Sequence, residues 1–270
     1  MTDAMLPAEL RRARIADRVR LDGILRVADA ASEFGVSEVT IRSDLGRLEA
    51  AGLVRRVHGA ALPVPGAPRE EPVERVSARD AAAKRAIGRR AASLVGSGTS
   101  VLLDVGSTTL AVAHALVDRA ERGELDELVV VTNGLAIALA LEPAVPRITV
   151  VLTGGTLRPL QHSLVDPGAS AALAELHVDL AILGCNGVDA EGRITNLNLA
   201  EAEVKRAMLA ASAAQLVVAD AAKLGVRHLG TIGVAGGATT LVTAGAWTDA
   251  AAAVASGVAG LGARVVRADA

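Results

Sequence analysis

Hydrophobic residues recur at a helical spacing in the segment 37–52. Ile41, Leu45 and Leu48 stand at positions i, i+4 and i+7, so they share one face of a helix. Ser37 is a residue type that caps helix N-termini, and Gly52 is one that commonly follows a helix. The pattern predicts a short amphipathic helix whose opposite face is polar.

Two similar patterns precede this segment, over 6–21 and 27–34. The letters "FGVS" between the second and third patterns predict a tight turn, which gives a helix-turn-helix. After the third helix, "LVRRVHGAAL" predicts two short strands around a turn, a wing. We therefore expect residues 1–62 to form a winged helix-turn-helix.

Farther along the chain, short apolar runs alternate with helical periods. Strands are predicted at "SVLLDV", "LVVVTN", "ITVVLTGG", "DLAILGCNG" and "QLVVAD", and helices at 78–95, "TTLAVAHALVDRA", "GLAIALAL" and "LAEAEVKRAMLAA". This alternation predicts an α/β domain with a parallel sheet covered on both faces. The stretch 229–248 has no charged residue, but glycines and threonines interrupt it, so we expect buried strands and loops and no membrane span.

Proline marks the boundary between the two patterns. The stretch "LPVPGAPREEP" at 62–72 contains four prolines and a charge cluster, which predicts an extended linker. The expected organisation is a winged helix-turn-helix domain at 1–62, a linker at 63–76 and an α/β domain at 77–270.

The bulk composition limits the partners of the chain. A hydrophobic content of 51% permits a large core, and a net charge of −2 means that any attraction for nucleic acid comes from a local patch. The single cysteine, Cys185, excludes an internal disulfide. The first residues do not resemble a signal peptide, so we expect a cytoplasmic protein.

Arginine and hydroxyl side chains surround the predicted third helix. With its apolar face turned inward, residues of its polar face such as Arg42 and Arg47 point outward. A helix in the major groove, flanked by arginines on phosphates, uses such a surface. A protein-binding winged module, or a three-helix domain with a solvated basic face, is the alternative. The residues expected to contact double-stranded DNA are Arg11, Arg12, Ser37, Thr40, Arg42, Ser43, Arg47, Arg55, Arg56 and His58.

Polar residues stand where the predicted strands end, and ligands of parallel sheets bind at the carboxyl ends of strands. The "GSTT" at 106–109 opens a helix, where free N–H groups and hydroxyls suit a phosphate. Lysine is rare in this chain, and two of its three lysines, Lys205 and Lys223, fall near these ends, whereas the third is Lys84. The residues expected to bind an anionic, polyhydroxylated effector are Asp104, Gly106, Ser107, Thr108, Thr109, Asn133, Gly134, Gly154, Gly155, Asn186, Gly187, Glu201, Lys205, Asp220 and Lys223.

Simpler roles are open for several of these residues. Asp104 is also suited to cap the next helix, and Glu201 with Lys205 is also an ordinary i, i+4 pair. The five histidines lack ligand spacing, so we expect no metal, and without a Walker A sequence or a nucleophile elbow we expect no cofactor.

Two other functions stay open at this point. In an aldose–ketose phosphate isomerase, Asp104, Glu203, Asp220 and Lys223 would move a proton, although a fused DNA-binding domain argues against an enzyme. A protein-interaction scaffold is the third hypothesis.

Several motifs together resemble the DeoR family of bacterial transcriptional regulators. They are, in order, "RRARIADRVR", "FGVSEVTIRSDLGRLEAAGLVRRVHGAA", "LGCNGVD", "EAEVKRAM" and "DAAKLG". The chain departs from the family pattern at Ser43, where a second arginine is usual, at Ala60, where glycine is usual, and at "LVTAG", where a strand is commonly followed by Thr-Asp.

The resemblance implies a function and an effector. The family's effector domain is related to ribose-5-phosphate isomerase and binds phosphorylated sugars or intermediates. We accordingly expect a repressor of sugar metabolism genes that a phosphorylated sugar releases from its operator. Because helix-turn-helix proteins bind half-sites about 34 Å or a multiple of that apart, we also expect a homo-oligomer.

Overall fold

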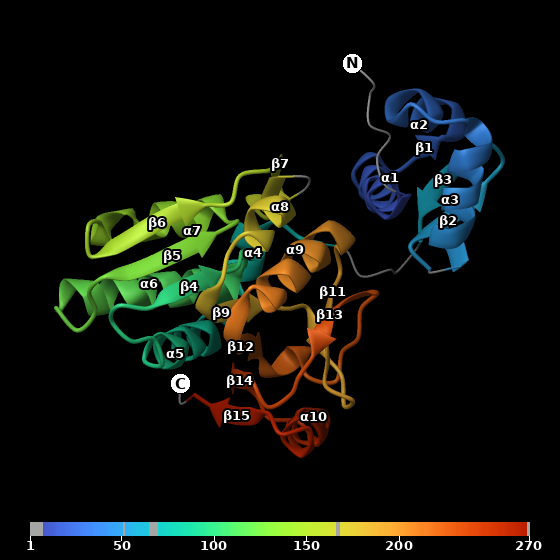
Figure 1. The fold of residues 1–270 in the computed structure, drawn as a ribbon. Helices are drawn as coiled ribbons and strands as arrows, with labels where there is room; N and C mark the ends of the chain where they lie inside the picture. Colours follow the sequence, from blue (N-terminus) through green and yellow to red (C-terminus); the bar gives the residue numbers. More distant parts are fainter. Residues whose placement is uncertain (1–7, 51, 65–69, 166–167, 269–270) are drawn as a thin grey trace. The chain divides into compact units, whose positions relative to one another are not determined.

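The structure is a computed structural model that describes residues 8–50, 52–64, 70–165 and 168–268. It divides into two compact units (Figure 1). We call the first, Met1–Glu70 with Leu197–Ala200, the head, and the second, Glu71–Asn196 with Glu201–Ala270, the sensor unit. The division falls inside the predicted linker 63–76, of which residues 65–69 lie outside the described residues.

The head contains the three predicted helices. Ser37 caps the third, because its Oγ accepts a hydrogen bond from the Thr40 amide at 3.2 Å. Gly52 follows that helix in the left-handed conformation, with a φ of 70°. The apolar faces of the helices meet in one core that includes Ile15 and Ile41. The helices are α1 (Ala8–Asp22), α2 (Val27–Phe34) and α3 (Glu38–Ala50).

The predicted wing belongs to a three-stranded sheet. Its strands are β2 (Val54–Val57) and β3 (Ala60–Pro63), which pair antiparallel. On its other side β3 pairs with β1 (Leu25–Arg26), a two-residue strand that leads directly into α2. Sequence analysis did not predict β1, because two residues are too few to show a periodicity.

Seven parallel strands form the main sheet of the sensor unit, in the order β15-β14-β12-β9-β4-β5-β6. The α/β fold class and the parallel sheet are therefore confirmed. The strands are β4 (Ser100–Leu103), β5 (Leu128–Thr132), β6 (Ile148–Leu152), β9 (Val178–Gly184), β12 (Ser212–Asp220), β14 (Thr239–Ala244) and β15 (Arg264–Arg267).

Helices cover both faces of this sheet. On one face, α5 (Ala81–Ala92), α6 (Ser107–Glu121) and α7 (Leu135–Leu141) form a core with strand residues such as Val218. On the other, α9 (Leu199–Ala210) and α10 (Asp249–Gly260) form a core with residues such as Val217. Consecutive residues of β12 thus enter different cores, because side chains alternate along a strand.

The helices α5 and α6 approach each other closely at Gly88. A Cβ atom at this position would lie 2.5 Å from the carbonyl oxygen of Ala111. Glycine therefore permits the close packing of the two helices, although it lowers helix propensity by about 1 kcal/mol relative to alanine.

The region of the predicted helix 78–95 differs from the expectation. In the structure α4 (Val73–Ala78) precedes α5, and Asp80 between them has a left-handed φ of 49°. The helix 78–95 is therefore shorter than predicted, and α4 occupies part of the predicted linker.

Smaller elements were not predicted, because most of their strands span two to four residues. A hairpin and a second, three-stranded sheet lie outside the main sheet. The stretch 229–248 forms strands, as expected. In the part of the chain that the structure describes, no helix has the length and apolarity to cross a membrane. The additional elements are β7 (Thr156–Arg158), β8 (Ser163–Val165), α8 (Gly168–Ala174), β10 (Gly187–Val188), β11 (Arg193–Asn196) and β13 (Gly230–Val234), together with α10 and β15.

Candidate functional site

The polar face of α3 borders a groove in the head. The groove has a volume of about 500 Å³, and its lining includes Arg42 and Leu45 of α3 and Arg56 and His58 of the wing. Arg42, Ser43 and His58 are exposed, whereas Leu45 is buried. The predicted recognition helix and the wing therefore present their polar side chains to a common concave surface.

The arginines of this surface differ in their ion pairs. Among the described residues, Arg47 and Arg55 are exposed and make no recorded ion pair. Arg42 Nη2 lies 2.5 Å from Glu38 Oε2, an exposed i, i+4 pair. Such pairs contribute only about 0.3–0.5 kcal/mol, so a phosphate or a base can compete for the guanidinium.

Arg56 fastens the wing to α3. Its Nε donates to Glu49 Oε2 at 2.7 Å, and its backbone amide donates to Glu49 Oε1 at 2.8 Å. These hydrogen bonds hold the pKa of Glu49 below its ordinary value. Arg56 therefore has a structural partner that competes with any contact to DNA.

Arg11 is not on the surface, which corrects its assignment as a DNA contact. Its side chain is buried, and its Nε lies 2.6 Å from Oδ2 of Asp44. Arg12 makes a longer contact of 3.4 Å with the same carboxylate and stays partly exposed. A basic run in the sequence does not reveal which arginine the helix turns toward α3, so the burial of Arg11 was not predictable.

The amino end of α3 holds both structural and exposed groups. The hydroxyls of Ser37 and Thr40 lie 2.9 Å apart, so both take part in the cap. Val39, which sequence analysis did not select, has 72% of its surface exposed. It precedes Arg42 by three residues and so shares its face, a spacing that was visible in the sequence.

In the sensor unit, a buried ion pair lies at the carboxyl end of β4. Oδ2 of Asp104 accepts a hydrogen bond from Gly184 N at 3.0 Å and another from Nζ of Lys205. Asp104 is fully buried and Lys205 is 3% exposed. The other carboxylate oxygen, Oδ1, is buried without a partner among the described residues. The simpler role of Asp104 as a helix cap does not occur in α6.

The pKa values of Asp104 and Lys205 are both raised, but for different reasons. Burial raises the pKa of Asp104 to about 6, against the opposing charge of Lys205. Burial alone would lower the pKa of Lys205, but the carboxylates of Asp104 and Glu201 hold it above its ordinary value. Each partner therefore favours the charged form of the other and opposes the effect of burial.

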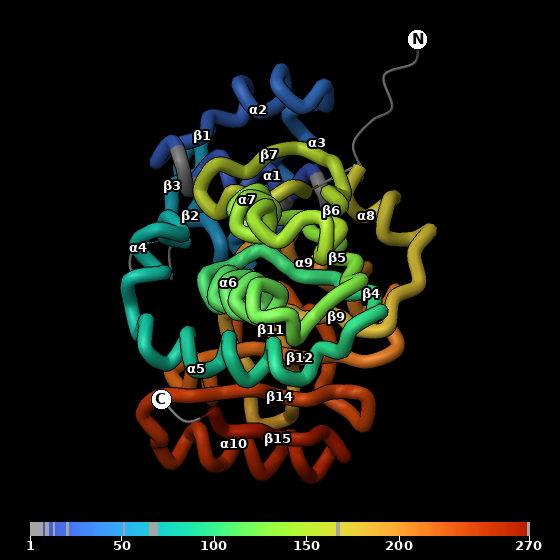
Figure 2. The backbone as a smooth tube through the Cα atoms, turned by 90° about the vertical axis from the view of Figure 1, so that its left-hand side faces the viewer, coloured from blue at the N-terminus to red at the C-terminus, as the bar shows by residue number. Residues whose placement is uncertain are grey.

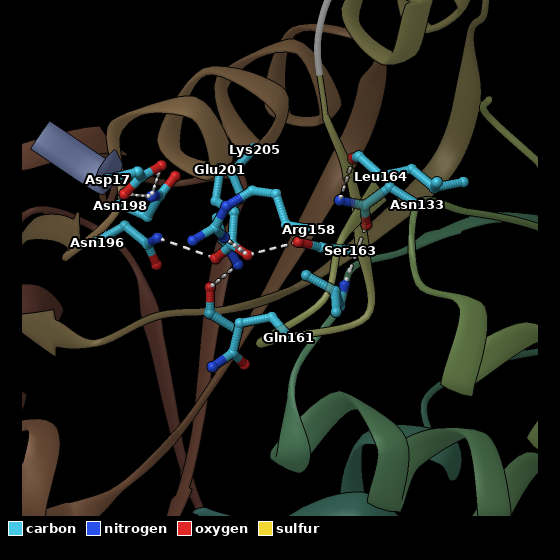
Figure 3. A network of polar contacts seen from close by, with 12 residues as sticks. Asp17, Asn133, Arg158, Gln161, Ser163, Leu164, Asn196, Asn198, Glu201 and Lys205 are labelled. Atoms are coloured by element: carbon cyan, nitrogen blue, oxygen red, sulfur yellow. Dashed lines mark hydrogen bonds and ion pairs between the residues drawn. The ribbon is translucent and has the colours of Figure 1, made fainter. Parts of the chain in front are cut away.

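Glu201 is the centre of a second polar network (Figure 3). Its carboxylate accepts hydrogen bonds from Arg158 at 2.5 Å, from Ser163 Oγ at 2.8 Å and from Asn196 Nδ2 at 3.3 Å. Burial favours a higher pKa for Glu201, but Arg158 and Lys205 outweigh it and hold the pKa below the ordinary value. Sequence analysis did not select Arg158 and Ser163, because they belong to the unpredicted β7–β8 hairpin.

The "GSTT" segment begins α6, as predicted. Gly106 has a φ of 141°, which favours glycine, and Ser107 is partly exposed. Thr109 Oγ1 donates to the Gly106 carbonyl at 2.9 Å, and the buried Thr108 Oγ1 has no partner among the described residues. Of the three hydroxyls expected to hold a phosphate, only that of Ser107 therefore belongs to a residue with appreciable exposure.

Several predicted ligand residues have structural roles instead. Asn133 is fully buried: its Oδ1 accepts from Val105 N at 3.1 Å and its Nδ2 donates to the Leu164 carbonyl at 3.3 Å. Its amide therefore joins the segment after β4 to β8 and is not available to a ligand, which corrects its assignment.

Three of the predicted glycines stand where the chain packs closely. A Cβ at Gly155 or at Gly187 would lie 2.3 Å from a backbone carbonyl oxygen, and one at Gly134 would lie 2.9 Å from a carbon of Ile137. Gly154 instead has open space around it and a φ of 75°, and Asn186 is partly exposed. These close neighbours explain why glycine stands at these three positions, and the assignment of Gly134, Gly155 and Gly187 as ligand contacts stays a prediction.

Lys223 is the more accessible lysine of the carboxyl edge. Its Nζ lies 3.6 Å from Asp220 Oδ2, and 21% of its side chain is exposed. Lys84 lies near Lys223 and Asp220, because the charges of both act on it. Burial and the charge of Lys223 lower the pKa of Lys84, whereas Asp220 raises it. Lys84 Nζ donates to the carbonyl oxygens of Val76 and, at 2.7 Å, Arg79.

The buried thiol of Cys185 lies within the electrostatic range of two of the lysines. Burial raises its pKa, and the charges of both Lys223 and Lys205 act on it in the opposite direction. The three lysines of the chain therefore lie in one region of the sensor unit. Among the described residues, no three His, Cys, Asp or Glu side chains converge in a way that could hold a metal ion.

Comparison with known proteins identifies both units. The DeoR-like helix-turn-helix domain matches residues 11–64, and the DeoR C-terminal sensor domain matches residues 79–244. The HTH-type transcriptional regulator GlpR of Haloferax volcanii is 36% identical over 214 residues, which are 79% of this chain and 80% of that protein.

Another relative and one solved structure have lower sequence identity to this chain. The glycerol-3-phosphate regulon repressor of Escherichia coli is 29% identical over 204 residues, 76% of this chain and 78% of that protein. Ribose 5-phosphate isomerase from Plasmodium falciparum is 15% identical, with a TM-score of 0.39 over 52% of this chain and 51% of that one. The match of both domain models, in order and over most of the length, shows that the chain belongs to the DeoR family of DNA-binding transcriptional regulators.

Proposed function

We propose that the sensor unit binds a phosphorylated sugar at the carboxyl edge of its sheet, and that binding releases paired heads from an operator of sugar metabolism genes. The observation that carries the proposal is the pair of ion pairs that end the central strands, Asp104 with Lys205 and Asp220 with Lys223. Ligands of parallel sheets bind at this edge. The relative from Escherichia coli is named for the regulon of a phosphorylated polyol.

Lys223 and Ser107 are the residues that we assign to the phosphate. Both are partly exposed, and Ser107 lies at the amino end of α6, where free backbone N–H groups attract an anion. Asp104 and Lys205, in contrast, are buried and bonded to each other. We assign them to holding the ends of β4 and β9 in place.

Two sets of hydrogen bonds supply a route from this region to the start of the sensor unit. Lys84, near Lys223, donates to carbonyl oxygens at the end of α4. In the β7–β8 turn, next to Arg158, the carbonyl oxygen of Leu160 accepts a hydrogen bond from the Val73 amide at 3.0 Å. An anion bound at Lys223 would change the electrostatic potential at Lys84. The change would alter the hydrogen bonds from Lys84 to the end of α4.

Release of an operator fragment tests the proposal. Fluorescence anisotropy would follow a labelled operator during titration with pentose and hexose phosphates, with the unphosphorylated sugars and inorganic phosphate as controls. Lys223→Ala should abolish release without changing operator affinity. Arg227→Ala removes a more exposed cation four residues farther along the chain and should leave release intact. Release by unphosphorylated sugars, or full release from the Lys223→Ala protein, would contradict the assignment.

The second candidate function is an aldose–ketose phosphate isomerase, which the pKa of Asp104 favours, since a carboxyl with a pKa of about 6 is suited to proton transfer. Its burial and its two hydrogen bonds to Gly184 and Lys205 argue against contact with a substrate. We propose that the sensor unit binds its effector without converting it. A coupled turnover assay with the sugar phosphate that releases DNA tests this, and saturable turnover would favour the enzyme.

A further inference from the structure

The chain passes between the head and the sensor unit at three peptide bonds. The division into units places these crossings directly before Glu71, directly after Asn196 and directly before Glu201. A change in the sensor unit that travels along the chain to the head must therefore pass through one of these three residues.

One network of hydrogen bonds contains all three residues. Asn196 Nδ2 donates to Glu201 Oε2 at 3.3 Å. Arg158 and Ser163 of the β7–β8 hairpin donate to Glu201 Oε1 at 2.5 and 2.8 Å (Figure 3). In the turn of the same hairpin, Gln161 Nε2 donates to the carbonyl oxygen of Glu71 at 2.7 Å. We call these six residues the junction network: Glu71, Arg158, Gln161, Ser163, Asn196 and Glu201.

The turn of the hairpin also holds the residues that follow the first crossing. The carbonyl oxygen of Leu160 accepts a hydrogen bond from the Val73 amide at 3.0 Å, and His162 Nε2 lies 3.3 Å from Glu74 Oε1. Figure 2 shows the hairpin, at the label β7, and α4 on the same side of the sensor unit. A shift of the hairpin relative to α9 therefore also changes the hold on the start of α4.

The centre of the network, Glu201, stands one helical turn before Lys205 in α9. Lys205 forms the buried ion pair with Asp104 at the carboxyl end of β4. The carboxylate of Glu201 helps to hold the pKa of Lys205 above its ordinary value, and Lys205 helps to hold the pKa of Glu201 below its own. Buried charges act on one another more strongly than charges in water. An anion bound at the carboxyl edge therefore alters the balance of charge at Glu201.

On the head side, the short segment between the second and third crossings is fastened to α1. This segment, Leu197–Ala200, belongs to the head. Asn198 Nδ2 donates to both carboxylate oxygens of Asp17, at 2.8 and 2.9 Å (Figure 3), and Asn198 is buried. The segment leaves the junction network at Asn196 and returns to it at Glu201, so a displacement of either residue acts on α1.

We propose that the junction network passes the effector signal from the sensor unit to the head, with Arg158 as the residue that positions it. The inference rests on the proposed function and assigns its regulation to particular side chains. The effector anion changes the balance of charge at Glu201, Arg158 and the hairpin adjust, and the chain shifts at all three crossings. Such a shift requires that the effector bind one arrangement of the network more tightly than the other.

Replacing Arg158 by methionine tests the proposal in the full chain. Fluorescence anisotropy follows operator release by pentose and hexose phosphates, of which ribose 5-phosphate and glucose 6-phosphate are the first probes. A saturating sugar phosphate should weaken operator binding by the wild-type protein about 5–150-fold, the usual range of allosteric coupling. For Arg158→Met this factor should fall below about 2-fold. The affinity for the operator alone, and the calorimetric affinity for the sugar phosphate, should stay close to the wild-type values.

Arg119→Met is the matched control. The Arg119 side chain is 18% exposed, against 14% for Arg158. It pairs with Glu124 at 3.6 Å and donates to the carbonyl oxygen of Val95 at 2.7 Å, outside the junction network. This control should lose stability to a similar extent and still release its operator as the wild type does.

A second variant gives a readout even if Arg158→Met does not fold. Gln161→Ala removes a single hydrogen bond, the one from the turn to Glu71, and leaves the ion pair of Glu201 in place. It should lower the coupling factor at least about 2-fold, as mutations along a coupling network do.

The outcomes separate this inference from the proposed function. Full release from Arg158→Met or from Gln161→Ala would overturn the junction network and leave the effector site intact. Equal loss of release in Arg119→Met would overturn it as well, because a general loosening of the sensor unit would then be the cause. Loss of sugar phosphate binding in Arg158→Met would make Arg158 a ligand contact instead. If no pentose or hexose phosphate released the wild-type protein, the proposed function itself would fail, and the inference with it.

Discussion

Replacing Lys205 by methionine should destabilise the sensor unit in a manner that depends on pH. Lys205 and Asp104 form a buried ion pair, and methionine keeps the length of the side chain while removing its charge. Removing one partner of a buried pair typically costs about 3–5 kcal/mol, because the other charge stays buried without compensation. We expect a loss of about 3 kcal/mol at about pH 8.

The loss should shrink in acid. Burial raises the pKa of Asp104 to about 6 while Lys205 opposes the rise, so the variant's Asp104 has a pKa higher still. A carboxyl whose pKa is raised on folding favours the folded state at low pH, and this contribution is lost as the pH rises through the folded pKa. At about pH 5 the carboxyl is neutral in the variant, and we expect a loss below about 1 kcal/mol.

The single tryptophan makes the measurement specific to the sensor unit. Trp247 lies in that unit, with the guanidinium of Arg267 at 4.3 Å from its ring centroid. Urea unfolding followed by tryptophan fluorescence therefore reports the sensor unit even if the head unfolds separately. Arg85→Met, a loss of charge on the exposed face of α5, serves as the control.

Two results would refute the reasoning. An equal loss of stability at both pH values would mean that the charge of Asp104 is not the cause. The double variant Asp104→Asn/Lys205→Met should recover part of the loss at about pH 8, since it removes the uncompensated carboxylate. A double variant no more stable than Lys205→Met would show that the lost packing of the lysine dominates.

Four further predictions concern the head and the helix packing. Arg42→Ala should lower operator affinity by about 1–3 kcal/mol together with sequence discrimination, as measured by anisotropy on operator and random DNA; equal weakening on both would assign Arg42 to phosphate. Arg55→Ala should reduce the slope of log affinity against log salt by about one unit, and an unchanged slope would remove Arg55 from the interface. Val39→Ala should alter preference among operator variants at one base pair and leave random-DNA affinity unchanged; a uniform loss would contradict base contact. Gly88→Ala should lower the unfolding midpoint because of the close Ala111 carbonyl, whereas Gly260→Ala, which has open space, should not; a stabilised Gly88→Ala protein would contradict the close packing.

The main architecture was predictable because its signals repeat along the chain. The stripe of Ile41, Leu45 and Leu48 and the caps at Ser37 and Gly52 define α3 to within a residue or two. The long apolar strands of the main sheet are equally clear. The short strands of the hairpin and of the second sheet carry too few residues for any periodicity, and they were missed.

The candidate sites were predictable by region more than by residue. The rule that ligands bind where parallel strands end selected Asp104, Lys205 and Lys223, which do lie in one region. It also selected Asn133, whose amide turned out to bond to backbone groups. Arg158 was missed because its partner Glu201 is 43 residues away in the sequence, and such a pairing depends on tertiary structure.

The pairing of β3 with both β1 and β2 limits how far the wing can move relative to the helices of the head. Because β1 leads directly into α2, the wing and the helix-turn-helix must move together when the wing tilts. The hydrogen bond from Arg56 to Glu49 adds a second connection between the wing and the recognition helix. The wing and the recognition helix therefore keep one relative geometry, and the head behaves as a single rigid body.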